Sequence, residues 1–375
     1  MILGIDASRA NTKQRTGVEQ YAFNIIQGLK KVLPSDVEVI LYSQTALEGE
    51  LAELPSHWRS KVLSWPPRRL WTQIRLGVEM LFHKPDILFI PAHVPPLLHP
   101  RKTVMMIHDV AAFRFPETYN IFERWYSLWS ARYALKRLWR IIVPSEFTGK
   151  ELCALTKPSL RKAVIAVIHH GFDMRYNIDE RNPSTVDVFS KYGLRKPYIL
   201  SIGRLEEKKN TLRVIQAFNA IKKTVEKKLS ESQLVLVGKP GHGYESVKRA
   251  IDSSPYKADI IELGWVSEQE LPYILKEAVV FLFPSLHEGF GLPVLEAFAS
   301  GTPAIVSKDS ASAEIASSAA LSVDPLNVED ISDALILLLK DFERREQYKK
   351  RGFQRLQDFS WGKAARKTAD LLLDR

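Results

Sequence analysis

Residues 281–303 read FLFPSLHEGFGLPVLEAFASGTP. The first residues are apolar and suit a buried strand, and the glycine-rich sequence after them suits a turn. A short helix is predicted next, because Pro293 fits a first helical turn, where its missing N–H is no loss. Another apolar run follows Pro303. The segment therefore predicts a strand, turn, helix and strand, which is the unit of a parallel sheet covered by helices.

The same alternation extends over the whole chain. Strands are predicted at Ile2–Ile5, Val37–Tyr42, Asp86–Ile90, Thr103–Ile107, Arg140–Val143, Val164–Ile168, Tyr198–Ile202, Gln233–Val237, Asp259–Leu263, Val279–Phe283, Pro303–Ser307 and Leu321–Val323. Helices are predicted at Val18–Leu33, Leu70–Phe82, Ile121–Leu138, Phe147–Leu155, Thr211–Leu229, Ser267–Glu277, Pro293–Ala299, Val328–Asp341, Glu343–Gln357 and Trp361–Leu373. Continuous apolar strands indicate burial on both faces. The predicted fold class is α/β, with two doubly wound, Rossmann-like domains that face each other across a cleft.

A polar segment divides the chain. Residues 173–197 contain Asn182-Pro183-Ser184 and are predicted to be a linker. The predicted domains are residues 1–175 and 176–357. With 375 residues, the chain is long enough for two such domains.

Composition and charge restrict the class of protein. An apolar share of 45% fits a globular protein, and the lone Cys153 fits a reducing compartment, so we expect a cytoplasmic location. Residues 1–175 have 24 basic and 15 acidic side chains, whereas residues 176–375 have 29 and 28. The excess of positive charge in the first half indicates an anionic partner there, which is nucleic acid, a phosphate-bearing acceptor or an anionic membrane surface.

The first predicted strand is not followed by a dinucleotide-binding G-x-G-x-x-G sequence, and no G-x-x-x-x-G-K-[ST] sequence occurs. A nicotinamide-dependent enzyme and a P-loop nucleotide triphosphatase are therefore disfavoured. Gly17 opens a predicted helix, where free N–H groups are able to hold an anion. A simple turn glycine explains Gly17 equally well.

Two cations lie in the first loop of the second domain. Arg204 and Lys209 follow the strand that ends at Gly203, and Asn210 is predicted to cap the next helix. A guanidinium and an ammonium at this position are able to neutralise a diphosphate leaving group. A solvated loop is the simpler interpretation of these two residues considered alone.

The glycine-rich turn contains two acids at a spacing that suits ligand binding. Glu288 lies in the turn and Glu296 in the helix, where carboxylates accept hydrogen bonds from paired sugar or ribose hydroxyls. Phe290 belongs to the same predicted donor-binding turn, and the N–H groups of Gly291 and Leu292 form a predicted anion cradle. An acid near a helix start also offsets the helix dipole.

With these motifs the chain resembles the retaining glycosyltransferases of family four, which have the GT-B fold. Glu288 and Glu296 match the E-x7-E motif of that family, and Gly203–Asn210 matches its diphosphate-binding loop. Val143–Thr148 matches its PSEF segment, and His108-Asp109 matches its HD pair. The resemblance implies that Glu288 holds the donor sugar and Glu296 the ribose, while Arg204 and Lys209 bind the diphosphate.

The resemblance also implies roles for the two domains. Residues 1–175 form the acceptor side, residues 176–357 bind the nucleotide sugar, and the helix within residues 358–375 crosses back to the first domain. His108 lines the donor sugar from the first domain. From its position alone, His108 is either an acid–base catalyst or a packed histidine. The retaining reaction that the resemblance implies needs no such catalyst, so His108 is expected to orient the donor.

We expect no metal ion and no cofactor. The chain has no Asp-x-Asp sequence, the carboxylate pair that usually holds a divalent cation on a nucleotide diphosphate. We therefore expect Arg204, Lys209 and helix N–H groups to neutralise the charge of the diphosphate. The donor substrate is expected to be a GDP- or UDP-sugar.

A helix with basic and aromatic residues suggests a possible acceptor surface. Residues 121–140 include Arg124, Arg132, Lys136 and Arg140 at multiples of four, with Trp125, Tyr126, Trp129 and Trp139 close by. A core-facing aromatic stripe with a solvated basic side is the simpler interpretation. The alternative is peripheral contact with the inner face of an anionic membrane that carries a lipid-linked acceptor.

The predicted activity is hexosyl transfer from a nucleotide sugar to a glycan or lipid-linked acceptor. The sequences Asp6-Ala-Ser, Gly17–Tyr21, Trp71–Gln73 and Pro91–His93 resemble those of bacterial polysaccharide mannosyltransferases, so mannose from GDP-mannose is the first candidate. The alternatives are a GT-B nucleotide-sugar epimerase and a basic nucleic-acid-binding protein. The absence of a nucleic-acid-binding motif favours the transferase and predicts no nucleic-acid partner.

Overall fold

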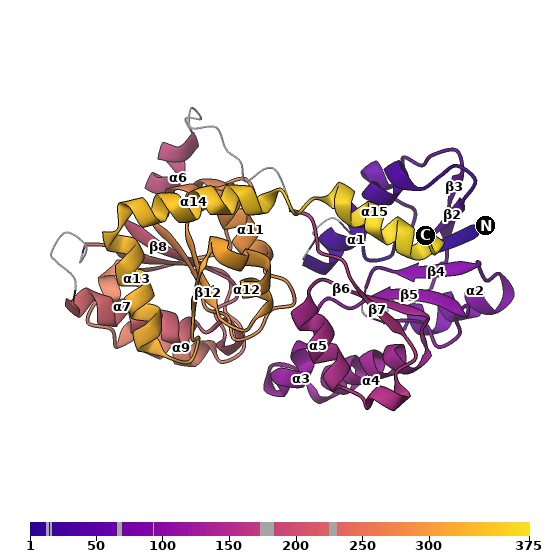
Figure 1. Ribbon diagram of the computed structural model, residues 1–375, viewed down its shortest axis with the longest axis horizontal. Helices are drawn as coiled ribbons and strands as arrows, with labels where there is room; N and C mark the ends of the chain where they lie inside the picture. Colours follow the sequence, from indigo (N-terminus) through magenta and orange to yellow (C-terminus); the bar gives the residue numbers. More distant parts are fainter. Residues whose placement is uncertain (13–14, 16, 66–69, 93, 173–183, 225–230) are drawn as a thin grey trace. The chain divides into compact units, whose positions relative to one another are not determined.

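The computed structural model describes residues 1–375 except residues 13–14, 16, 66–69, 93, 173–183 and 225–230 (Figure 1). The chain forms two compact units. Unit 1 consists of Met1–Gly171 and Phe359–Arg375, and unit 2 consists of Phe172–Asp358. His93 and the pair Asn182-Pro183, which the sequence analysis used, lie outside the described residues.

Unit 1 contains a seven-stranded sheet in the order β3-β2-β1-β4-β5-β6-β7, in which all paired strands are parallel. Its strands are β1 (Ile2–Asp6), β2 (Glu38–Ser43), β3 (Trp58–Val62), β4 (Ile87–Ile90), β5 (Lys102–Met106), β6 (Arg140–Val143) and β7 (Val164–Val167). The α-helices described in unit 1 are α1 (Gly17–Val32), α2 (Gly77–Phe82), α3 (Ala111–Arg114), α4 (Ile121–Arg137), α5 (Glu146–Ala154) and α15 (Trp361–Leu373), and a π-helical turn, η2 (Thr72–Leu76), directly precedes α2.

A separate hydrophobic core lies on each face of this sheet. Leu3, Ile5 and Phe89 point to one core, which also includes the buried faces of α1 and α15. Leu88 and Ile90 alternate with them and point to the other core, which includes residues of α2 and α4. This alternation of fully apolar strands is what a sheet covered on both faces requires.

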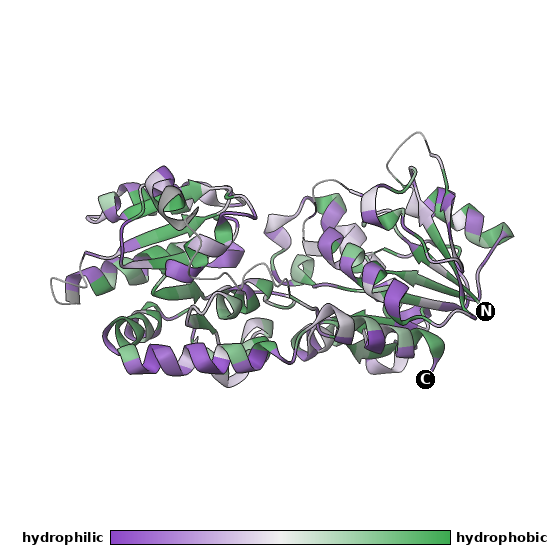
Figure 2. Cartoon of the chain, turned by 90° about the horizontal axis from the view of Figure 1, so that it is seen from above, coloured by the Kyte–Doolittle hydropathy of each residue, from purple (hydrophilic) through white to green (hydrophobic). Residues whose placement is uncertain are grey.

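Unit 2 contains a six-stranded parallel sheet in the order β10-β9-β8-β11-β12-β13. Its strands are β8 (Tyr198–Ile202), β9 (Gln233–Val237), β10 (Ile260–Gly264), β11 (Val280–Phe283), β12 (Ala304–Ser307) and β13 (Leu321–Val323). Its helices are α6 (Ser184–Tyr192), α7 (Thr211–Thr224), α9 (Tyr244–Asp252), α10 (Leu271–Glu277), α11 (Leu292–Ala299), α12 (Ala311–Ala316), α13 (Val328–Lys340) and α14 (Phe342–Leu356). Most strands of both units consist mainly of apolar residues (Figure 2), and the edge strand β3 is an exception.

The predicted fold class of two doubly wound parallel α/β domains is confirmed. Three local predictions are wrong. The segment predicted to be a linker contains helix α6. Arg140 lies in strand β6 and not on the helix of Arg124, because α4 ends at Arg137. The helix predicted from Ser267 begins at Leu271 as α10, after a turn in which the Glu270 N–H donates to Ser267 Oγ at 3.3 Å.

Candidate functional site

The order of the strands reverses once in each sheet. In unit 2 the reversal lies between β8 and β11, and in unit 1 it lies between β1 and β4. The loops that follow two such strands diverge to opposite sides and leave a crevice where α/β sheets bind ligands. Each unit therefore has one position at which its fold favours a ligand site.

In unit 2 this position contains a lysine–glutamate pair. Lys209 comes from the loop after β8 and Glu288 from the loop after β11, and Lys209 Nζ donates to Glu288 Oε1 at 2.5 Å. Both side chains are mostly buried, with exposures of 19% and 15%. Phe283 lies under the ammonium, with its ring centroid 5.4 Å from Nζ. The two loops thus present one positive and one negative group at the same point.

The lysine stem is held against the backbone of Gly203. A Cβ at Gly203 would lie 3.2 Å from Lys209 Cδ, and Gly203 has a φ of +149°. The two loops are also joined by a backbone hydrogen bond from Leu286 N–H to Lys208 O of 2.9 Å. Because the stem and the loop are both restrained, the ammonium is preorganised at the crevice.

Asn210 does not cap helix α7 with its side chain as predicted. Its backbone is left-handed, with φ 60° and ψ 27°. Its side-chain amide donates to Pro284 O at 3.0 Å and to Pro325 O at 2.6 Å. Asn210 instead joins the loop of Lys209 to the loop of Glu288 through its hydrogen bond to Pro284 O. Asparagine is suited to this position because it tolerates the left-handed conformation.

Arg204 lies on the same loop, but its side chain is 67% exposed. Its guanidinium donates to Pro240 O at 3.4 Å, and its Nε lies 3.7 Å from Glu206 Oε2. The structure therefore brings Lys209 and Glu288 together and places Arg204 at the rim of the loop.

Helix α11 begins directly after the glutamate loop. Gly291 precedes it with a φ of +109°, and a Cβ there would lie 3.0 Å from Ser312 Oγ. Leu292, Pro293 and Glu296 are the half-exposed residues of the helix, on the side away from the core. Phe290 is buried. The first N–H groups of a helix have no partner within it, so this end is suited to a phosphate.

In unit 1 a large cavity lies at the reversal point, with a volume of about 1340 Å³. Its lining includes Asp6, Ser8, Glu19, Trp71 and Gln73, which come from sequences that suggested a mannosyltransferase. The cavity exceeds the roughly 300–1,000 Å³ of a drug-sized ligand site. Burial raises the pKa of Asp6, whose carboxylate accepts the Ser8 N–H at 2.9 Å. Gly17, a predicted donor-binding residue, is the first residue of α1, directly before Val18 of this lining.

His108 follows strand β5 and packs in an aromatic cluster. Its ring lies 4.8 Å from that of Tyr21 and 5.5 Å from that of His170, and its Nε2 lies 3.2 Å from Pro91 O. Burial lowers the pKa of His170 to about 3. A histidine packed in this way is positioned with little freedom to rotate.

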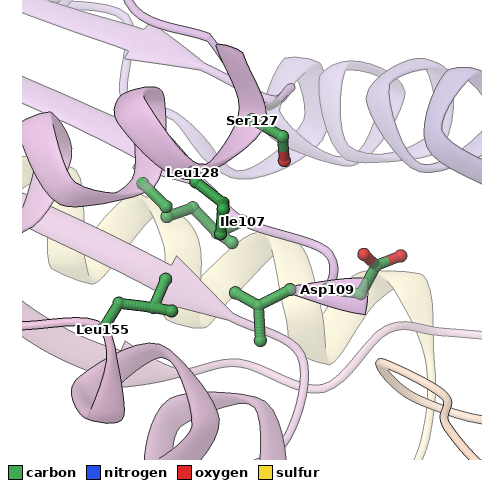
Figure 3. A pocket seen from close by; sticks show the side chains of 7 residues that line it. Ile107, Asp109, Ser127, Leu128 and Leu155 are labelled. Atoms are coloured by element: carbon green, nitrogen blue, oxygen red, sulfur yellow. The ribbon is translucent and has the colours of Figure 1, made fainter. Parts of the chain in front are cut away.

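A second, small pocket lies beside the His108 segment (Figure 3). It has a volume of about 10 Å³, room for about one water molecule, and its apolar lining residues are Ile107, Val110, Leu128, Ala131 and Leu155. The pocket is too small for a substrate. Within the described ranges, no group of three acidic, histidine or cysteine side chains is arranged to hold a metal ion. Among the helices described, none is both long and apolar enough to span a bilayer.

Family models match both units. Residues 15–176 match the model described as Glycosyltransferase Family 4, and residues 188–355 match the one described as Glycosyl transferases group 1. The chain is 27% identical over 297 residues to O-antigen chain mannosyltransferase B of Escherichia coli, covering 79% of this chain and 74% of that protein. It is 23% identical to O-antigen chain mannosyltransferase RfbU of Salmonella typhimurium, covering 86% of this chain and 90% of that protein.

Solved structures resemble the whole chain. The glycosyltransferase WaaG, described as involved in lipopolysaccharide biosynthesis, aligns with a TM-score of 0.70 at 14% identity over 99% of both chains. HepE of Anabaena, in complex with UDP and glucose, aligns with a TM-score of 0.73 at 16% identity over 100% of this chain and 99% of that one. At these identities the likeness concerns the fold.

Proposed function

Because the chain belongs to the family 4 glycosyltransferases, which have the GT-B fold, we propose that it transfers mannose from a nucleoside diphosphate donor to a glycan or lipid-linked acceptor. Hexosyl transfer follows from the family and from the mannosyltransferase relatives. GDP-mannose is the first donor candidate, since relatives that span most of this chain are mannosyltransferases. HepE was solved with UDP-glucose, so UDP-glucose is the second.

The observation that carries this proposal is the pair of Lys209 and Glu288 at the reversal of the unit 2 sheet. An ammonium has three N–H donors, so Lys209 is able to bind a phosphate oxygen while one donor stays on Glu288. The second carboxylate oxygen of Glu288 accepts a hydrogen bond from a hydroxyl of the donor sugar. Glu296, one turn into α11, is assigned to the ribose hydroxyls.

The proposed reaction retains the configuration of the sugar. The acceptor hydroxyl oxygen forms a bond to C1 of the sugar on the face from which the phosphate departs, and the bond from C1 to the phosphate oxygen breaks. The departing phosphate oxygen takes the proton of the acceptor hydroxyl. Lys209, Arg204 and the N–H groups at the start of α11 stabilise the growing charge, and His108 orients the donor.

No metal ion has a task in this scheme. A divalent cation normally neutralises the diphosphate, and here fixed positive groups of the chain do so. The donor-binding role of unit 2 and the acceptor-binding role of the cavity in unit 1 belong to the same proposal.

The two alternative functions have less support. Both family models describe glycosyltransferases, and the similar proteins include mannosyltransferases and sucrose-phosphate synthases. The positive charge that suggested nucleic acid is explained as well by an anionic acceptor carrier.

Thermal unfolding with nucleotide sugars tests the donor assignment. A ligand at about 100 times its dissociation constant adds about 2.7 kcal/mol to the stability of the folded protein. We expect GDP-mannose to raise the melting temperature more than UDP-glucose does, and GDP alone to retain most of the shift. A shift with UDP-glucose only would overturn the mannose assignment, and no shift with any nucleotide sugar would overturn the donor site.

A further inference from the structure

The loop after β8 contains a buried acid to which the proposed reaction gives no task. Glu206 lies between Arg204 and Lys209, and its side chain is only 9% exposed. Its neighbour Glu207 is exposed, as a charged loop residue normally is. A buried carboxylate loses hydration, so it is generally paired with groups that compensate its charge.

The burial of Glu206 comes from the loop that follows β9. Leu205 and Pro240 form a parallel β-bridge between the two loops. Leu205 N–H donates to Lys239 O at 3.0 Å, and Gly241 N–H donates back to Leu205 O at 3.1 Å. These hydrogen bonds extend the pairing of β8 with β9 and join the two loops directly beside Glu206.

Two glycines of the β9 loop allow this close approach. A Cβ at Gly238 would lie 1.9 Å from Gly203 O. A Cβ at Gly241 would lie 2.5 Å from Glu206 Oε2 and 2.7 Å from Glu206 Cβ. The side chain of Glu206 therefore lies flat against the backbone of Gly241, where it has little room to move.

Each oxygen of this carboxylate faces a different cation of the same loop. Glu206 Oε2 lies 3.7 Å from Arg204 Nε, and Oε1 lies 4.0 Å from Lys208 Nζ. An ion pair of two exposed side chains contributes little, since ordering both costs about as much as their attraction gains. Because Glu206 is already ordered by its burial, only Arg204 remains to be ordered in this pair.

The contacts of Arg204 lie on one edge of its guanidinium. Nε faces Glu206, and Nη2 donates to Pro240 O at 3.4 Å. Nη1 makes no hydrogen bond or ion pair with any residue that the structure describes. The edge formed by Nη1 and Nη2 is thus open to a ligand, and such a planar fork binds two phosphate oxygens at once.

We propose that Glu206 is a positioning residue for donor binding, which orders the guanidinium of Arg204 so that its open edge is presented to the donor diphosphate. This inference rests on the function proposed above, in which Arg204 binds the diphosphate. The charge of Glu206 by itself repels a nucleotide. A carboxylate without the positioning role would therefore only weaken nucleotide binding, and the two cases predict opposite effects of removing its charge.

Calorimetric titration of the full chain with GDP and with UDP tests the proposal. Ordering a long side chain on binding costs the equivalent of about three- to tenfold in affinity. We expect Glu206→Gln, which keeps the shape of the side chain, to weaken nucleotide binding by this factor. In steady-state kinetics KM for the nucleotide sugar should rise equally, with turnover at saturation unchanged. The matched control is Glu207→Gln, which removes the same charge from the exposed neighbour and should not weaken binding.

A double-mutant cycle shows whether Glu206 acts through Arg204. In the Arg204→Ala chain the guanidinium is absent, so adding Glu206→Gln should cause no further loss of affinity. Gly241→Ala is a second probe that retains the charge, because its new methyl group would displace the carboxylate. It should weaken nucleotide binding only in the chain that has Arg204. Thermal unfolding without nucleotide checks that each variant folds.

Other results would overturn the proposal. Tighter binding in Glu206→Gln and in Glu207→Gln alike would mean that Glu206 only repels the nucleotide. An undiminished loss in the Arg204→Ala chain, or a fall in turnover at saturation, would mean that Glu206 supports the loop as a whole. Nucleotide binding that Glu206→Gln leaves unchanged would contradict the positioning role alone, whereas a chain that binds neither GDP nor UDP would contradict the proposed function as well.

Discussion

Lys209 and Arg204 occupy one loop, but their surroundings give them unequal roles. Lys209 is held between Gly203, Phe283 and Glu288, whereas Arg204 extends toward solvent. A group already in place when charge develops contributes more to catalysis than one that must first be ordered. We therefore expect Lys209 to act mainly in the transition state and Arg204 mainly in donor capture.

Replacing Lys209 by alanine should lower turnover about 10²- to 10³-fold and affect donor affinity less, because the charge on the diphosphate grows as the glycosidic bond breaks. Steady-state kinetics with a saturating nucleotide sugar measures both parameters. Lys208→Ala is the matched control, since Lys208 lies 4.0 Å from Glu206 and belongs to the same loop. Unchanged turnover in the Lys209 variant would remove that residue from the mechanism.

Replacing Glu296 by alanine should weaken nucleotide binding about 10- to 100-fold with little change in turnover at saturation. Hydrogen bonds to the ribose exist equally in the ground and transition states, so they contribute to binding and not to the barrier. Calorimetric titration with the nucleoside diphosphate measures the affinity. Glu329→Ala, at the start of α13, provides a control. Intact affinity together with lost turnover would contradict the assignment.

Replacing Gly291 by alanine should destabilise the protein by about 1–3 kcal/mol, because its φ of +109° disfavours a side chain and the new Cβ would lie 3.0 Å from Ser312 Oγ. Urea unfolding measures the change. Gly17→Ala is a suitable comparison, since its Cβ would meet nothing within 4 Å, and we expect no loss of stability there. Equal stability of the two variants would show that neither the φ of Gly291 nor its contact with Ser312 requires a glycine at this position.

The element that closes unit 1 comes from the end of the chain. Helix α15 packs on α1, where a Cβ at Gly28 would lie 2.6 Å from Ala365 Cβ. Its first residue, Trp361, stacks on His170 with ring centroids 6.1 Å apart, and a Cβ at Gly171 would lie 2.3 Å from Trp361 N. Only glycine at positions 28 and 171 permits α15 to approach this closely.

His170 makes this contact sensitive to acid. Its pKa falls from 6.5 to about 3 because burial disfavours the charged form. Between these two values the unfolded chain binds a proton that the folded chain does not, so the histidine lowers stability as pH falls below about 6.5. His170→Phe should reduce this loss, by at most about 1.4 kcal/mol per pH unit. Urea unfolding across this pH range measures it, with His83→Phe as an exposed control. Parallel pH profiles for the unaltered chain and the His170 variant would contradict the explanation.

The pattern of apolar residues predicted most of the strands and helices, and the elements that it missed have local explanations. Strands such as Tyr198–Ile202 and Gln233–Val237 match the prediction residue for residue, because they are buried on both faces and consist of apolar runs. Strand β3 was missed because it lies at the edge of the sheet, where only Trp58 is buried. Helix α12 was missed because its six residues, ASAEIA, are too short and too small to show a period.

At the scale of the molecule, the sequence predicted the loops of the candidate site but not their pairing. Lys209 and Glu288 are 79 residues apart, and only the order of the strands brings them together. The cavity of unit 1 combines short sequences from β1, α1 and the segment before α2 for the same reason. The exposure of Trp125 on α4 could not be predicted, since aromatic residues at helical spacing suit a core equally well.

Activity should survive exhaustive chelation. Lys209, Arg204 and the start of α11 are the groups to which we assign the charge of the diphosphate, and a cation beside them would be repelled. Turnover is measured before and after EDTA treatment, with Mg²⁺ and Mn²⁺ added back. Loss on chelation with recovery on adding metal would mean that carboxylates far apart in the sequence assemble a cation site.

Unit 2 lies within the sequence of unit 1, and this arrangement has a consequence for synthesis on the ribosome. The 171 residues of the first segment emerge before the 187 residues of unit 2, and α15 emerges after them. Helix α1 ends at Val32 and α15 begins at Trp361. At about 5–20 residues per second, α1 therefore waits roughly 15–65 s for the helix that covers it. During translation the nascent first segment therefore exposes the apolar side of α1, and a chaperone that binds such surfaces has its longest opportunity there.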